Sequence, residues 1–357
     1  MNEKAESFPT NATIQTVVKA IPPYDPMKIP VQQGRPCLPS NQHYNPLQLF
    51  LLFFDWDLIE DICNQTNSFA ERTKSDTSSW RPVTKIELLH YFGCLIRIGL
   101  YSQQNQRYLY NPAGGCLSGC PLSKNRFEQI TKYIHFKDRG ENAVKGEDWW
   151  LKLGTAWTTI KAKCPRYWIP GSNLTVDEVM IKFEGRSSQI INIPAKPIPL
   201  GFKLEALADR GYILNWEATR PGRNEGGQGK IHVPLPEDVD STLDPCLTNT
   251  QAIVARLATT LNPYLSTGRR FHFYLDNLFV CWRLCSYLKG QGIAVTGTCR
   301  KGACGIPPRL LALKGASIGL KWGALQVSIV HEVACFLWQD QSAVLGTYLF
   351  ILLYYFS

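Results

Sequence analysis

The spacing of apolar residues divides the chain into three stretches. In residues 1–44, prolines are scattered among polar residues, and the apolar positions follow neither a helical nor a strand period. This pattern predicts a flexible lead-in. Residues 45–168 repeat apolar positions at the spacing of amphipathic helices. Residues 169–357 contain short runs rich in β-branched and aromatic residues, which are typical of strands. We therefore expect a helical region followed by a domain built on a sheet.

Three helices are predicted in the helical region. Residues 47–67 read as one amphipathic helix. Thr84 and Glu87 have the spacing of a capping box and open a second helix. Four apolar residues of this helix can share one face: Ile86, Leu89, Leu95 and Ile96. The third helix begins near Ser123 and places apolar residues at helical spacing: Phe127, Ile130 and Ile134. Its basic residues are expected on other sides of the helix: Lys124, Arg126, Lys132 and Lys137.

The strands of the second domain are predicted from five short runs, at residues 174–183, 189–194, 202–209, 212–218 and 271–276. Helical patterns at residues 248–265 and 280–292 surround the last run. This order predicts a mixed α/β fold with a central mixed sheet.

The composition limits the class of protein. At 357 residues with 45% apolar content, the chain has material for two domains with cores and is unlike a disordered sequence. No stretch reaches the roughly 20 apolar residues of a membrane helix, so we expect no membrane partner. The formal charge of +9 favours a polyanionic partner without identifying it. The twelve cysteines lack the paired spacing of a zinc site and are expected to be reduced thiols.

Two aspartates stand where catalytic carboxylates could lie. Asp177 lies inside an apolar run, where a buried charge would need a partner or a cation. Asp276 ends another run, and ligands of α/β sheets gather at strand ends. Successive strand residues face opposite ways, so Glu178 cannot point to the same site as Asp177. Two aspartates on neighbouring strands could hold Mg²⁺, and a pair of such ions supports displacement at phosphorus. A turn or a salt bridge would explain each aspartate equally well.

Three blocks of sequence carry a resemblance to a known family. The first contains Asp177-Glu178, then Phe183-x-Gly185-Arg186, Pro194-x-Lys196-Pro197 and Gly201-x-Lys203. The second contains Asp276-Asn277-x-Phe279, then Gly297-Thr298-x-Arg300 and Gly305-Ile306-Pro307. An upstream helical block contains Arg126-Phe127 and His135-Phe136-x-Asp138. In order and content these blocks resemble the piggyBac family of transposases over roughly residues 49–348.

The resemblance implies an RNase H-like catalytic core behind a helical DNA-binding and dimerisation region, so we expect the boundaries 1–44, 45–168 and 169–357. It implies cut-and-paste transposition with Mg²⁺ or Mn²⁺, in which Asp177 and Asp276 match the first two catalytic and metal-binding aspartates. The family's third and fourth aspartates lie in a Gly-Val-Asp-x-x-Asp motif, and the 357 residues contain no such motif. Asp340 matches a position that is not catalytic in the family. We therefore expect a C-terminally truncated transposase remnant without its last catalytic helix and without activity.

Double-stranded DNA is the expected partner, and a homodimer and a nuclear location are expected with it. Residues 299–321 contain basic residues and no acid, which suits a DNA-backbone loop as well as a solvated one. The residues expected to contact DNA are Lys124, Arg126, Arg186, Lys196, Lys203, Arg300 and Lys301.

Two other interpretations stay open. The chain could be a retained DNA- or chromatin-binding protein in which catalysis plays no part. It could also come from a truncated or frame-shifted gene model of an active transposase, which a Gly-Val-Asp-x-x-Asp segment encoded downstream of codon 357 would reveal.

Overall fold

The computed structural model describes residues 27–39, 43–73, 80–101, 109–111, 114–138, 146–226, 230–233, 245–302, 306–315, 321–330, 333–340 and 342–348. The chain forms two compact units, and each is described by itself. One is helical and spans Leu38–Arg166. The other combines Met1–Cys37 with Tyr167–Ser357 and contains the sheet. In the described part of the chain, no helix combines the length and apolar character that crossing a membrane requires.

The helical unit begins with two helices where one was predicted. These are α2 (Pro46–Phe53) and α3 (Trp56–Thr73). The helix is interrupted at Asp55. The Oδ1 of Asp55 accepts a hydrogen bond of 2.9 Å from the backbone N–H of Leu58 and so caps α3. The prediction of a single helix over residues 47–67 is therefore wrong, because a capping aspartate lies inside an otherwise continuous apolar pattern.

Helix α4 (Lys85–Leu100) opens with the predicted capping box, in which Thr84 and Glu87 exchange hydrogen bonds. Its buried face is not the predicted one. Ile86, Leu95 and Ile96 are exposed. The residues that enter the core are Leu88, Tyr91, Phe92 and Cys94. Because α4 is apolar on most sides, its periodicity did not distinguish the inner face from the outer one.

Helix α5 (Lys124–Tyr133) begins at the Ser123 cap, as predicted, and buries Phe127 and Ile130. Helix α6 (Gly154–Lys163) lies between two short 3-10 turns, η3 (Trp149–Leu153) and η4 (Cys164–Tyr167). The four helices α3 to α6 contribute to one apolar core, which includes Ile59, Ile62 and Leu117.

The end of the predicted lead-in is ordered. Strand β1 (Arg35–Pro36) pairs with β2 (Trp168–Ile169) in an antiparallel ladder. Residues 27–37 therefore belong to the sheet-containing unit, where a flexible segment was expected, while residues 1–26 lie outside the described residues. The chain passes from one unit to the other between Cys37 and Leu38 and again between Arg166 and Tyr167.

The sheet is mixed, as predicted, and its strands follow the order β10-β11-β12-β9-β8-β3-β5-β6-β7. The central strands are β3 (Asn173–Lys182), β5 (Leu200–Asp209), β6 (Tyr212–Arg220), β8 (Phe271–Leu275) and β9 (Ile293–Thr298). The outer strands are β4 (Ile191–Asn192), β7 (Arg223–Asn224), β10 (Leu325–Val330), β11 (Val333–Gln339) and β12 (Ala343–Tyr348). Strand β3 is parallel to β8 and β8 to β9, and the other pairs are antiparallel. Three antiparallel strands continued by two parallel ones form the RNase H-like arrangement that the resemblance implied.

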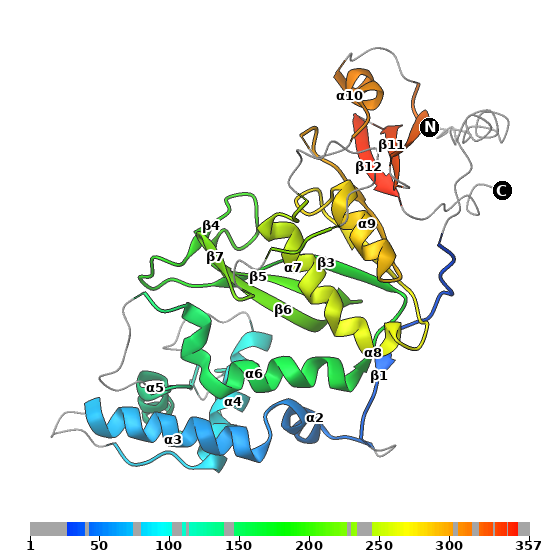
Figure 1. The fold of residues 1–357 in the computed structure, drawn as a ribbon. Helices are drawn as coiled ribbons and strands as arrows, with labels where there is room; N and C mark the ends of the chain where they lie inside the picture. The colour runs from blue at the N-terminus through cyan, green and yellow to red at the C-terminus, as the bar shows by residue number, and fades with distance from the viewer. Residues whose placement is uncertain are drawn as a thin grey trace, which may run out of the picture. The chain divides into compact units, whose positions relative to one another are not determined.

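Two helices pack on one face of this sheet, α7 (Asn249–Ala258) and α9 (Trp282–Gly290), and both lie in front of it in Figure 1. They bury Phe271, Phe273 and Val176 of the sheet in the larger apolar core. The remaining elements are η5 (Thr259–Leu261), α8 (Asn262–Leu265) and α10 (Pro308–Gly315). The other face of β3 and β8 carries polar residues, and the candidate site lies there.

Candidate functional site

Asp177, in the middle of β3, and Asp276, directly after β8, are the next residues where the parallel ladder between these strands ends. The ladder between β3 and β8 runs from Asn173 opposite His272 to Val176 opposite Leu275. Asp177 and Asp276 are the next residue on each strand, so they continue the same register. Residues in register on adjacent strands project to the same side of a sheet. The structure therefore brings the two predicted aspartates to the same face of two adjacent central strands.

Both carboxylates are on the polar face and are exposed to solvent. The alternation along β3 buries Leu174 and Val176 against the helices and leaves Thr175 and Asp177 on the other side. The prediction that Asp177 is buried and so needs a partner is therefore wrong, because Leu174 and Val176 face the helices and Asp177 lies on the other side of the strand. Among the described residues, neither aspartate forms an ion pair with a lysine or arginine.

Glu178 faces away from this site, as the alternation predicts. Its carboxylate lies 3.0 Å from the Lys203 ammonium and 3.7 Å from that of Lys196. Lys203 also lies 2.7 Å from Glu205, which is almost completely buried. Burial raises the pKa of Glu205, and Lys203 acts against that rise. Glu178 and Lys203 are thus parts of a compensated charge cluster on the helix-covered side of the sheet.

The second sequence block surrounds Asp276 with a turn and a basic side chain. The backbone N–H of Phe279 donates to the carbonyl of Asp276 over 3.1 Å, and the fully buried Phe279 ring anchors this turn. The Nε of Arg300, which follows β9, donates to the Asn277 amide oxygen over 2.8 Å. Arg300 is otherwise exposed, so its guanidinium is held beside the aspartates at the same end of the sheet.

Gly297 explains why the second block contains a glycine. A Cβ at this position would lie 2.3 Å from the carbonyl oxygen of Leu275 and 2.7 Å from a methyl group of Val280. A side chain there would push β9 away from β8. The glycine therefore keeps Thr298 and Arg300 close to the strand that ends at Asp276.

The polar face contains residues that the sequence analysis missed. His272 and Tyr274 alternate with Phe271 and Phe273, and they precede Asp276 on the same side of β8. His272 Nε2 lies 2.6 Å from the hydroxyl of Thr296, and burial lowers the pKa of His272 to about 4. The imidazole is therefore neutral at pH 7. The period of two in this strand would have revealed both residues.

The residues predicted to contact DNA divide into two groups. Arg186, Arg300 and Lys301 in the sheet-containing unit and Lys124 in the helical unit are exposed. Lys196 is partly exposed and lies near Glu178. Lys203 is largely buried and compensates Glu178 and Glu205.

Arg126 was predicted to contact DNA, but its side chain is buried. Its guanidinium lies 3.0 Å from Glu87, the residue of the capping box on α4, and 4.9 Å above the Trp80 ring. Burial alone would raise the pKa of Glu87, but hydrogen bonds from Arg126 hold it below its usual value. Arg126 therefore joins α5 to α4 and is not a free cation for a phosphate.

No group of three or more His, Cys, Asp or Glu side chains is placed to hold a metal ion within the described ranges. What the structure does provide is the pair of Asp177 and Asp276. Carboxylate oxygens are the ligands that Mg²⁺ and Mn²⁺ prefer, and Mg²⁺ keeps several waters when one or two carboxylates bind it. The residues present are compatible with a divalent ion that completes its coordination from outside this pair.

The strand order β9-β8-β3-β5-β6, with its parallel and antiparallel pairs, is that of an RNase H-like domain. A family model described as Transposase IS4 matches residues 45–351, which is most of the chain. The chain belongs to this family and, within it, is of the piggyBac type that the sequence blocks indicated.

Two similar human proteins are also named as piggyBac-derived. PiggyBac transposable element-derived protein 2 of Homo sapiens is 25% identical over 85% of this chain and 48% of its own length. PiggyBac transposable element-derived protein 3 of Homo sapiens is 23% identical over 75% of this chain and 42% of its own length. The chain thus spans about half the length of these relatives.

A solved structure has the same fold. It is the cryo-EM structure of a piggyBac transposase synaptic complex with hairpin DNA, which superposes with a TM-score of 0.73 at 19% identity. The match covers 89% of this chain and 63% of that one. At this identity the likeness concerns the fold.

Proposed function

We propose that this chain is a DNA-binding protein derived from a DDE-type transposase and that Asp177 and Asp276 hold a divalent cation. The observation that carries the proposal is the register of β3 and β8, which places both aspartates side by side on the polar face. The two exposed carboxylates carry the same charge and have no cationic partner among the described residues, so a cation bound between them would remove their mutual repulsion. In this interpretation, Mg²⁺ or Mn²⁺ binds the carboxylates of Asp177 and Asp276 and supplies the positive charge.

The cation would polarise a phosphate oxygen and favour displacement at phosphorus when bound. The chain's own residues orient the site. The turn at residues 276–279 fixes the end of β8, and Arg300 is held nearby by Asn277. An exposed guanidinium at that position can pair with a phosphate oxygen of bound DNA.

DNA contact is proposed for the exposed basic residues, with duplex DNA as the partner. The net charge of +9 and the name of the solved structure, which contains hairpin DNA, both support this choice. We keep four residues as main contacts and Lys196 as a weaker one: Lys124, Arg186, Arg300 and Lys301. Lys203 and Arg126 are omitted because carboxylates of the fold already bind them.

We further propose that a polypeptide of these 357 residues does not cut DNA by itself. Asp177 and Asp276 supply one carboxylate each, while two metal ions in an in-line geometry need further ligands. A misplaced reacting group costs orders of magnitude in rate. A longer polypeptide with an additional carboxylate on a following element would remove this restriction.

DNA binding and strand cleavage test the proposal together. The purified chain is expected to bind duplex DNA at low salt. Its affinity should fall on the order of 10³-fold or more between about 50 and 200 mM salt, because lysine and arginine contacts to phosphates release bound counterions. No cleavage is expected with Mg²⁺ or Mn²⁺. Binding that is absent at low salt would refute the DNA partner. Cleavage that is lost on Asp177→Ala would refute the proposed inactivity.

We also propose a homodimer and a nuclear location, because the chain belongs to a transposase family and chromosomal DNA lies in the nucleus. Light scattering of the purified chain and a fluorescent fusion expressed in human cells are the tests. A monomer at all concentrations, or exclusion of the fusion from nuclei, would contradict the respective statement.

A further inference from the structure

A second charged region lies at the opposite end of the same two strands. Seven residues line a cavity of about 480 Å³ there: Pro30, Gln32, Ser172, Thr267, Gly268, Arg269 and Arg270. Ser172 directly precedes β3 and Arg270 directly precedes β8. Asp177 follows Ser172 by five residues (177 − 172 = 5), which is about 17 Å along a strand. The cavity is therefore distinct from the aspartate site.

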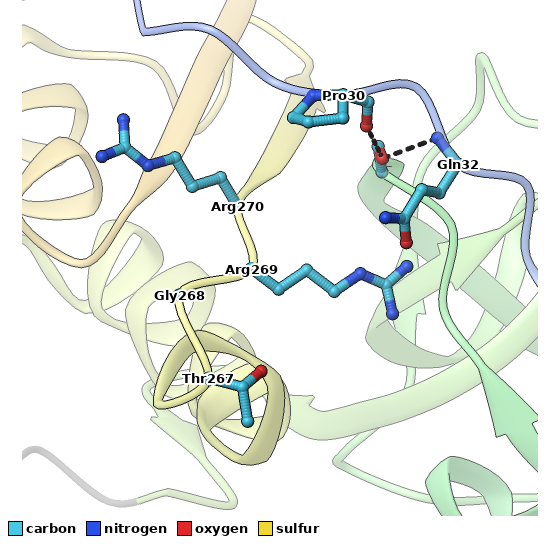
Figure 2. Close-up of a pocket in the computed structure, with 7 residues that line it drawn as sticks. Pro30, Gln32, Thr267, Gly268, Arg269 and Arg270 are labelled. Carbon is cyan, nitrogen blue, oxygen red and sulfur yellow. Dashed lines mark hydrogen bonds between the residues drawn. The ribbon is translucent and has the colours of Figure 1, made fainter.

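The N-terminal segment forms one wall of the cavity. The Ser172 hydroxyl donates to the Pro30 carbonyl over 2.6 Å and accepts from the Gln32 backbone N–H over 2.9 Å (Figure 2). The backbone N–H of Ser172 donates to the Gln32 carbonyl over 2.9 Å. A Cβ on Gly171 would lie 2.9 Å from that same carbonyl oxygen, so glycine permits the close approach. These contacts fix the backbone from which the Gln32 side chain extends.

Arg269 forms the opposite wall. Its guanidinium lies 5.3 Å from the centre of the Tyr264 ring and 5.1 Å from that of Phe271, and one of its nitrogens donates to the Pro170 carbonyl. Its Nε is buried without a hydrogen-bond partner. Burial lowers the pKa of Arg269, while Tyr264 and Asp209 act in the other direction. An arginine held this firmly still has unused donors, since a guanidinium has five N–H groups.

The polar ends of two side chains meet in the cavity. Figure 2 shows the Gln32 amide and the Arg269 guanidinium turned toward one another, with Arg270 extending to the other side of the backbone. No carboxylate lines the cavity. In the described part of the chain, neither Arg269 nor Arg270 forms an ion pair. The donors of Arg269 and Gln32 therefore face a space that no carboxylate lines, and the nearby buried carboxylate of Asp209 already accepts hydrogen bonds from Trp168 Nε1 and the Gly171 N–H.

We propose that this cavity is a phosphate-binding site in which Arg269 and Gln32 donate hydrogen bonds to the phosphate oxygens and Arg270 supplies a further positive charge at the rim. Phosphate fits because the planar guanidinium binds two of its oxygens at once, and such charge-assisted hydrogen bonds are strong. The phosphate is either a free small ligand or a backbone phosphate of bound DNA. This site does not depend on the proposed role of the aspartates.

Thermal unfolding of the full chain in sodium phosphate tests the site, with sodium chloride at the same ionic strength as reference. A ligand that binds only the folded state raises the midpoint in a saturable way. We expect such a rise for the wild-type chain and about tenfold weaker phosphate binding for Arg269→Gln, because a charge-assisted contact is lost. Gln32→Ala changes an exposed side chain and should weaken binding about threefold, the effect of one neutral hydrogen bond. Arg309→Gln is the control, because Arg309 is an exposed cation on α10 outside the cavity.

The outcomes separate as follows. A saturable rise that Gln32→Ala weakens and Arg309→Gln preserves supports the site even if Arg269→Gln folds poorly. A rise no larger than that in chloride, or one that Gln32→Ala and Arg309→Gln alter equally, overturns it. Duplex DNA then identifies the source of the phosphate. If Gln32→Ala lowers DNA affinity, the ligand is a backbone phosphate, and if it leaves DNA affinity unchanged, the ligand is a free phosphate.

Discussion

The two faces of strand β3 carry adjacent carboxylates in opposite situations. Asp177 is exposed on the polar face and has no cationic partner among the described residues, whereas Glu178 on the helix-covered face is paired with Lys203 and Lys196. One residue of displacement along a strand is enough to change the side of the sheet. The difference teaches which charges serve the fold and which are left for a ligand, because a buried charge must be compensated within the protein and an exposed one need not be.

The largest effect on stability is expected from removing Lys203, which pairs with Glu178 and Glu205 on the helix-covered face of the sheet. Lys203→Met should lower the free energy of unfolding by about 3–5 kcal/mol, because it leaves the buried carboxylate of Glu205 without its ammonium partner. Urea unfolding measures this loss. Lys182→Met is the matched control, since the Lys182–Glu184 pair is exposed and its loss should leave the urea midpoint close to that of the parent. If Lys203→Met were as stable as the parent and bound DNA more weakly, Lys203 would be a DNA contact after all.

The second prediction concerns how the stability of the chain depends on pH through His272, which is buried on the polar face of β8. Its pKa is about 4 in the folded chain, against 6.5 for a free imidazole. As the pH falls, the unfolded chain takes up this proton first, so the contribution to stability is complete above pH 6.5 and is lost as the pH falls toward 4. Between pH 7.5 and 5 the loss should be about 2 kcal/mol.

Denaturant titrations of the wild-type chain and of His272→Gln at both pH values isolate this contribution from that of the carboxylates. The variant should lose less stability than the parent on acidification. Equal losses would mean that His272 is open to solvent and that the polar face is exposed along its whole length.

A smaller effect is expected from the exposed cations beside the aspartates. Arg300→Gln should leave stability within about 0.5 kcal/mol of the parent, because its side chain is exposed. It should make the plot of log binding constant against log salt shallower by about 1, as expected for the loss of one phosphate contact. Arg309→Gln serves as the comparison. A salt dependence that Arg300→Gln leaves unchanged would remove Arg300 from the DNA contacts.

Much of the fold could be predicted because its local rules are followed. The capping box at Thr84 and the alternation around Asp177 depend on residues within a few positions of each other. The sequence blocks named both aspartates, and the ladder between β3 and β8 brings their strands together.

What could not be predicted depends on partners distant in the sequence. The helical period placed Arg126 outside the core, but Glu87, 39 residues away, binds it inside. Residues 27–37 have no apolar period, yet they are held by Ser172, 140 residues after Gln32. The inner face of α4 could not be chosen from a helix that is apolar nearly all round. In each of these three places the missing information was a tertiary contact.

The central claim is that Asp177 and Asp276 form one cation site, and Mn²⁺ titration followed by electron paramagnetic resonance tests it most directly. The wild-type chain should bind Mn²⁺ saturably, and Asp177→Asn and Asp276→Asn should each weaken binding by about tenfold or more, because each removes one of two carboxylate ligands. Both variants should unfold at the wild-type denaturant concentration. Asp340→Asn, which changes a carboxylate hydrogen-bonded to Trp322, should bind Mn²⁺ like the parent. Unchanged Mn²⁺ binding in either Asp177→Asn or Asp276→Asn would contradict the claim.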